Sequence, residues 1–123
     1  KGVIRDVVYT PGSIRPVDTR GYYNGDFDIL KIKITGAGII GACRYTIWGK
    51  DNDKLGINEG YKIVDDEIIN GQYQPLAYGM FIRFAGGTKS ATAVLNNEFE
   101  IELKGTSLET SVSQIGSIQL TRR

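Results

Sequence analysis

The chain has 123 residues, a length typical of one domain that is large enough to bury its own core. Its net charge is +1 and its fifteen basic residues are spread along the sequence, which argues against a nucleic-acid stripe or a polybasic membrane patch. A single cysteine excludes an internal disulfide framework, and the absence of histidine removes the commonest metal ligand and the commonest general base.

The beginning of the chain combines a strand-like segment with an irregular one. Val3–Tyr9 is rich in β-branched residues and ends at the turn sequence Thr10–Ser13, whereas Ile14–Asp26 contains turn residues and predicts no regular element. Residues 1–20 therefore have two interpretations. They form an N-terminal arm that adds to the sheet edge of a neighbouring copy, or Val3–Tyr9 is an ordinary first strand of the same domain, which we prefer.

Two alternating stretches joined by glycines occupy residues 27–49. Apolar side chains recur there at every second position: Leu30, Ile32, Ile34, Cys43, Tyr45 and Ile47. Residues 36–41 match the pattern G-x-G-x-x-G, but a dinucleotide site also needs a helix after the third glycine, and the sequence after Gly41 alternates as a strand does. We predict a β-hairpin with the second apolar set turned toward the core.

Further strands are expected along the rest of the chain. The pattern predicts short strands at 61–64 and 67–69 separated by an acidic turn, and longer ones around 80–84, 99–103 and 118–120. Residues 91–95 fit a short strand or a helical turn. These elements predict a single all-β domain over residues 1–123, an antiparallel β-sandwich of jelly-roll or immunoglobulin-like type with roughly seven to nine strands.

Candidate metal sites in the sequence are incomplete. Asp51–Gly56 begins like a calcium-binding loop, but Leu55 and Lys62 stand where oxygen ligands belong, so we expect a polar turn. Asp65–Glu67 places three adjacent carboxylates in what we expect to be a solvated turn. The sequence therefore predicts no metal ion and no cofactor.

Carboxylates are the only catalytic chemistry that the composition offers. Glu98, Glu100 and Glu102 share one strand face, where we expect Lys or Arg side chains of a neighbouring strand to pair with them. The serines and Cys43 have no histidine to activate them. We therefore expect the protein not to be an enzyme.

Five aromatic residues are the candidate contact sites. They lie in turn sequences or on nominally outward strand faces: Tyr22, Tyr23, Trp48, Tyr73 and Phe81. Outward aromatic rings stack on sugars or anchor protein partners. The alternative is that some are buried at the ends of the sandwich, and the sequence does not separate the two.

The order of short elements from Gly21 to Leu103 resembles β-sandwich modules of tailed-bacteriophage virion proteins and, more remotely, segments of flagellar hook and cap proteins. The resemblance rests on a Tyr-x-x-Gly start, two alternating strands, a loop and strand at 76–84, a Gly-Gly turn, and an end strand at 97–103. It implies a structural virion component of a tail, neck, baseplate, fibre or capsid decoration, which contacts copies of itself and other virion proteins. It implies no catalytic residues. The alternative is a carbohydrate-binding module that uses the five aromatic residues on a surface glycan.

Overall fold

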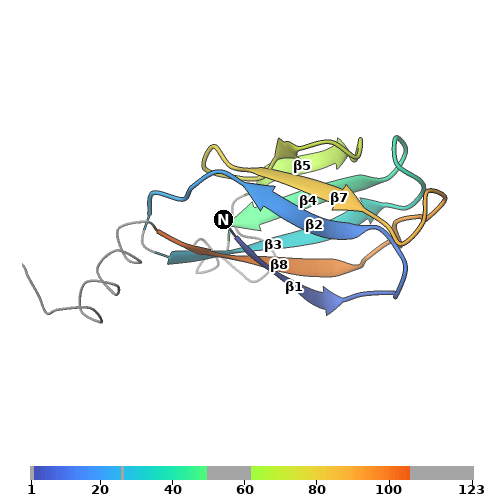
Figure 1. Cartoon of the computed structure of the whole chain (residues 1–123), viewed down its shortest axis with the longest axis horizontal. Helices are drawn as coiled ribbons and strands as arrows, with labels where there is room; N and C mark the ends of the chain where they lie inside the picture. Colours follow the sequence, from blue (N-terminus) through green and yellow to red (C-terminus); the bar gives the residue numbers. More distant parts are fainter. Residues whose placement is uncertain (1, 26, 50–61, 106–123) are drawn as a thin grey trace, which may run out of the picture.

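The computed structural model describes residues 2–25, 27–49 and 62–105, which form eight strands in two antiparallel sheets packed face to face (Figure 1). The larger sheet has five strands in the order β1 (Val3–Val8), β8 (Glu98–Lys104), β3 (Phe27–Gly36), β4 (Arg44–Gly49) and β5 (Lys62–Ile68). The smaller sheet has the order β2 (Arg15–Arg20), β7 (Phe81–Ala85) and β6 (Gln74–Pro75). The described residues contain no helix, and the predicted antiparallel β-sandwich is confirmed.

The core lies between the inner faces of the two sheets. The alternating apolar residues of β3, β4 and β8 are fully buried there, as the pattern predicts, and Ile82 and Phe84 of β7 cover them from the small sheet. Each such side chain contributes about 1.5–3 kcal/mol to folding. The register places Leu30 opposite Ile101, so the apolar residues of β3 and β8 point to the same face.

Tyr45 on β4 joins the sheets across this core. Its ring lies 4.9 Å from that of Phe84 between centroids, and its hydroxyl donates to the carbonyl of Pro75 on β6 at 2.9 Å. A buried tyrosine needs such an acceptor. Tyr45 therefore fixes the small sheet over β4.

The glycine-rich segment forms the predicted β-hairpin between β3 and β4. Gly38 and Gly41 have φ angles of +134° and +95°, which residues with a side chain rarely adopt. β4 follows directly, so no helix begins after Gly41. The sequence pattern of a dinucleotide site therefore occurs here without the structural context that such a site needs.

One prediction for the first part of the chain is wrong. Ile14–Asp26 was expected to be irregular, but residues 15–20 form β2 (Figure 1). Pro16 and Thr19 are buried on the inner face although they are three positions apart, because a register shift between Pro16 and Asp18 inserts Val17. The bulge breaks the period-2 pattern that would have revealed the strand.

The acidic turn expected near residue 65 is also wrong. Residues 62–68 are one strand, β5, and its pairing with β4 shifts between Tyr45 and Ile47, where Asp66 has a φ angle of +55°. Thr46 stabilises this bulge by accepting a hydrogen bond from the Asp66 amide at 3.0 Å. The three carboxylates are exposed, as expected, but they project from a strand.

Two further segments differ from the structure that the sequence predicts. Residues 91–95 form neither a helix nor a full strand, but a single bridge between Ala93 and Gly38. Gln74–Pro75, expected as part of a loop, forms the short strand β6. The strand expected at 118–120 and the turn expected at Asp51–Gly56 lie outside the described residues.

All four sheet edges are irregular. β1 and β2 each carry one register shift, β5 carries two, and β6 has only two residues, one of them Pro75. Bulges, short strands and proline at an edge hinder the addition of another strand. β1 is paired with β8 in the large sheet, and β2 is paired with β7 in the small sheet.

Candidate functional site

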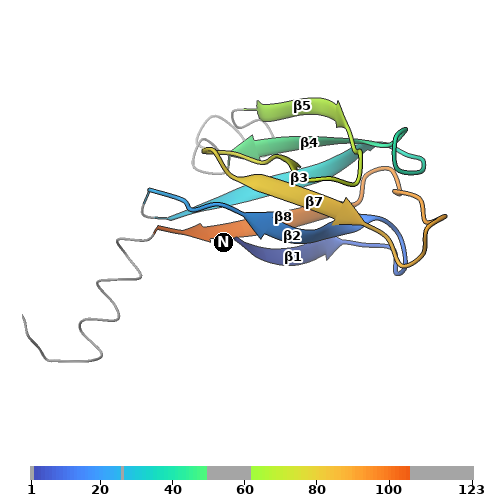
Figure 2. The ribbon, with the colours of Figure 1, turned by 45° about the horizontal axis from the view of Figure 1, so that its top comes forward.

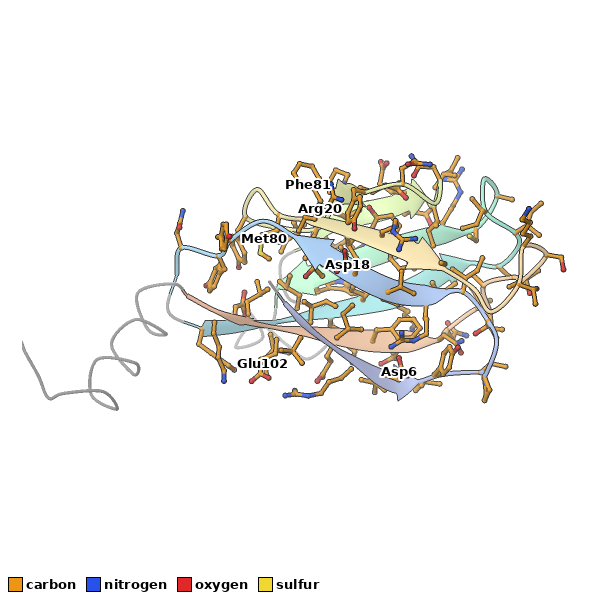
Figure 3. All side chains as sticks on the ribbon, viewed as in Figure 1. Asp6, Asp18, Arg20, Met80, Phe81 and Glu102 are labelled. Atoms are coloured by element: carbon orange, nitrogen blue, oxygen red, sulfur yellow. The ribbon has the colours of Figure 1, made fainter. Side chains whose placement is uncertain are left out.

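Aromatic and arginine side chains gather on the outer face of the small sheet, which we call the aromatic–arginine surface. It comprises Arg20, Phe81 and Arg83 of β2 and β7, Tyr73 before β6, and, in the loops after β2 and before β7, the exposed rings of Tyr22 and Tyr78. The register places Phe81 between Arg20 of β2 and Pro75 of β6. Figure 3 shows Arg20, Asp18 and Phe81 together over β2 and β7, whereas Glu102 lies toward the β1–β8 edge.

Tyr73 organises the centre of this surface. It precedes β6, and its hydroxyl donates to the carboxylate of Asp18 on β2, so the side chain spans β7. The guanidinium carbon of Arg20 lies 3.9 Å from the centre of the Tyr73 ring, and that of Arg83 lies 5.8 Å from it. Cation–π attraction holds both arginines against one ring.

The two arginines are not neutralised by a close ion pair within the described part of the chain. Asp18 is the nearest acidic residue by register, opposite Arg83, and its carboxylate accepts from Tyr73. A guanidinium group that stacks on a ring keeps its N–H donors at the edge of the group, available to a carboxylate. The surface therefore offers oriented positive charge beside apolar rings.

Exposed rings border this centre. Phe81 is 44% exposed, Tyr78 is 49% exposed and Tyr22 is 77% exposed. Tyr23 is half-buried and packs on Tyr78 with 4.9 Å between ring centroids. The Tyr78 hydroxyl donates to the buried carboxylate of Asp28 at 2.6 Å, which fixes this end of the surface to β3.

Of the five candidate aromatic residues, Tyr73 and Phe81 lie on the outer face of the small sheet, whereas Tyr22 and Tyr23 lie in the loop after β2, where Tyr23 packs on Tyr78. Trp48 is separate. It is half-buried on β4, opposite Lys31 of β3 and Lys62 of β5, on the outer face of the large sheet.

Sequence reasoning missed the arginines. Arg83 alternates with Ile82 and Phe84, which signals an outward position, but Arg20 lies in the strand that the Val17 bulge concealed. Figure 2 shows β2 and β7 stacked over the large sheet, with β5 at its far edge.

Two of the three β8 glutamates pair with basic residues of neighbouring strands, as expected. Lys31 pairs with Glu98 at 3.2 Å, and Arg5 pairs with Glu102. These pairs lie on the outer face of the large sheet. No group of three histidine, cysteine, aspartate or glutamate side chains is placed to hold a metal ion in residues 2–25, 27–49 and 62–105.

Two buried groups titrate away from their ordinary range. Burial raises the pKa of Tyr45 to about 12, with a further contribution from the carboxylate of Glu67, and burial raises the pKa of the Cys43 thiol. Both changes favour the neutral forms. Cys43 is therefore an unreactive core residue, as its phase with Tyr45 predicts.

Two open hollows flank the small sheet. One, of about 250 Å³, lies between β5 and the segment from Pro75 to Phe81 and is lined mainly by apolar side chains. The other, of about 440 Å³, is lined by residues around Gly86 and Gly87, together with Ile40 and Arg83. The first hollow joins the aromatic–arginine surface to the edge of the large sheet.

Comparisons with protein-family models, with curated proteins and with solved structures find no match for this chain. No described helix is long and apolar enough to cross a membrane.

Proposed function

We propose that the protein is a non-enzymatic structural component of a bacteriophage virion that acts through association with copies of itself and with other virion proteins. The observation that carries the proposal is the aromatic–arginine surface. Tyrosine and arginine are among the residues that contribute most to protein interfaces, and here they stand on the face of a rigid sheet. The resemblance of the chain to phage virion modules supplies the setting.

The composition of the surface supports association with protein. Exposed Phe81 and Tyr22 provide apolar area, while Arg20 and Arg83 are already oriented by Tyr73, so binding loses less side-chain entropy. The irregular sheet edges favour contacts through this face over strand addition.

Quantitative mass spectrometry of purified particles tests the virion assignment. We expect the chain in intact particles at a fixed multiple of the portal or tail proteins, and its gene beside other particle genes. A chain that is absent from particles and encoded outside any assembly locus would contradict the assignment.

A carbohydrate-binding module is the second candidate, and the 77% exposure of Tyr22 is the observation that favours it. Tyr73 is less suited to stack on a sugar than sequence reasoning assumed, because Arg20 covers one face of its ring. Glycan-array binding that disappears in Tyr22→Ala and persists in Trp48→Ala would support this candidate. An array without signal for the wild-type protein would remove it.

A further inference from the structure

The strand β5 carries a second exposed surface whose charge is opposite to that of the aromatic–arginine surface. Asp65, Glu67 and Ile68 are exposed on this edge strand, Ile68 to 41%, and they project from both of its sides: Glu67 stands opposite core-facing Tyr45, whereas Ile68 stands opposite Arg44 on the outer side. We call these three residues the acidic edge. It combines carboxylates with an apolar side chain, as the aromatic–arginine surface combines guanidinium groups with rings.

The carboxylates of the acidic edge are only weakly engaged within the chain. Asp65 lies 3.5 Å from Lys62, but both side chains are more than half exposed, so this pair contributes little. Glu67 makes no close ion pair with a described residue. Asp66 differs, because its carboxylate accepts from Thr35 at 2.8 Å and belongs to the bulge.

The acidic edge and the aromatic–arginine surface belong to different sheets of one copy. One is the outermost strand of the large sheet, and the other is the outer face of the small sheet (Figure 2). β6 and its link to β5 lie between them, held by a hydrogen bond from the Gln74 side chain to the Ile68 carbonyl at 2.7 Å.

Resting on the proposed self-association, we propose that the acidic edge of one copy binds the aromatic–arginine surface of a second copy. Asp65 and Glu67 of one copy pair with Arg20 and Arg83 of the next, and Ile68 packs against Phe81. Carboxylate–guanidinium pairing gives the contact its charge complementarity, and the apolar contact supplies burial. The bulge at Asp66 blocks regular strand pairing, so side chains make the contact.

Such a contact is heterologous, since it joins two different surfaces. Every copy keeps one unused surface of each kind, and further copies add until a ring closes or a filament grows. Rings and filaments are both arrangements expected of a component that is repeated in a particle.

Charge reversal on each surface tests the proposal. The face variant is Arg20→Glu with Arg83→Glu, and the edge variant is Asp65→Arg with Glu67→Arg, both measured as the full chain by sedimentation velocity at low salt. We expect each variant alone to associate roughly tenfold more weakly or worse than wild type, because each loses arginine–carboxylate contacts. Arg5→Glu, on β1 at the opposite edge of the large sheet from β5, serves as the control and should associate as wild type does.

A mixture of the two variants tests whether the acidic edge of one copy binds the aromatic–arginine surface of another. In an equimolar mixture the native acidic edge of the face variant meets the native aromatic–arginine surface of the edge variant, and the two reversed surfaces also carry opposite charges, so the mixture should regain the association that each variant alone loses. Circular dichroism and thermal melting establish that both variants fold. Wild-type association that survives both reversals would overturn this inference and leave self-association standing, and a mixture that stays monomeric would also overturn it. Loss of wild-type binding to an acidic glycan in the face variant, with association unchanged, would assign the surface to sugar instead.

Discussion

Two tyrosines of this sandwich make contacts between strands that the sequence pattern does not predict. Tyr45 was expected in the core as an apolar residue, and it also joins the sheets through the Pro75 carbonyl. Tyr73 was one of five candidate contact residues whose exposure the sequence left open, and it is the residue that holds Arg20 and Asp18 in place. Both roles depend on a hydroxyl group and on a partner from another strand.

The raised pKa of Tyr45 predicts a particular loss of stability in alkali. Its pKa is about 12 in the folded protein against 10.0 for an ordinary tyrosine, so its stabilising contribution is complete below pH 10 and is lost as the pH rises through 12. We expect the free energy of unfolding to fall more steeply over this interval in wild type than in Tyr45→Phe. Urea titrations from pH 9 to pH 12 measure both slopes, and parallel slopes would contradict the assignment.

The bulge residue Asp66 gives a second prediction at this scale. Its φ angle of +55° suits glycine and strains alanine. Asp66→Gly and Asp66→Ala both lose the hydrogen bond from Thr35, so their difference isolates the backbone. We expect the alanine variant to be roughly 1 kcal/mol less stable than the glycine variant by urea denaturation. Equal stability, or a more stable alanine variant, would show that the bulge relaxes.

Four strands were predictable from the alternation of their buried residues, and β1 was predicted from its β-branched residues, whereas bulges concealed β2 and divided β5. β3, β4, β7 and β8 keep period 2 through their buried residues and were all expected. β2 was missed because Val17 is an extra residue, and β5 was divided because Asp66 is one. The same limit applies to the site, since Tyr22, Tyr73 and Phe81 were expected but their partner Arg20 lies on a concealed strand.

The alternation of β8 predicts which leucine contributes most to the free energy of unfolding. Leu103 is fully buried on β8, whereas Leu95 is 51% exposed before it. We expect Leu103→Ala to lower the free energy of unfolding by about 2–5 kcal/mol and Leu95→Ala by less than about 0.5 kcal/mol. Chemical denaturation of the two variants compares the same substitution in both settings. Similar losses would place Leu103 outside the core.

The described part of the molecule is a two-sheet scaffold that carries its aromatic rings and arginines on the outside. The core is apolar and tightly paired, the outer face of the large sheet carries matched ion pairs, and the small sheet carries aromatic rings and arginines. Exposed apolar rings on a sheet face weaken solubility unless a partner covers them. The proposed self-association therefore requires that another protein chain covers the aromatic–arginine surface.

Sedimentation equilibrium of the wild-type chain, beside Tyr22→Ser with Phe81→Ser, tests this claim most directly. We predict that the apparent mass of wild type rises above 13.5 kDa with concentration, while the double variant, which is changed only at exposed positions, stays near 13.5 kDa. A wild-type protein that remains at 13.5 kDa at every concentration would contradict self-association, and a double variant that associates as wild type does would show that another surface is responsible.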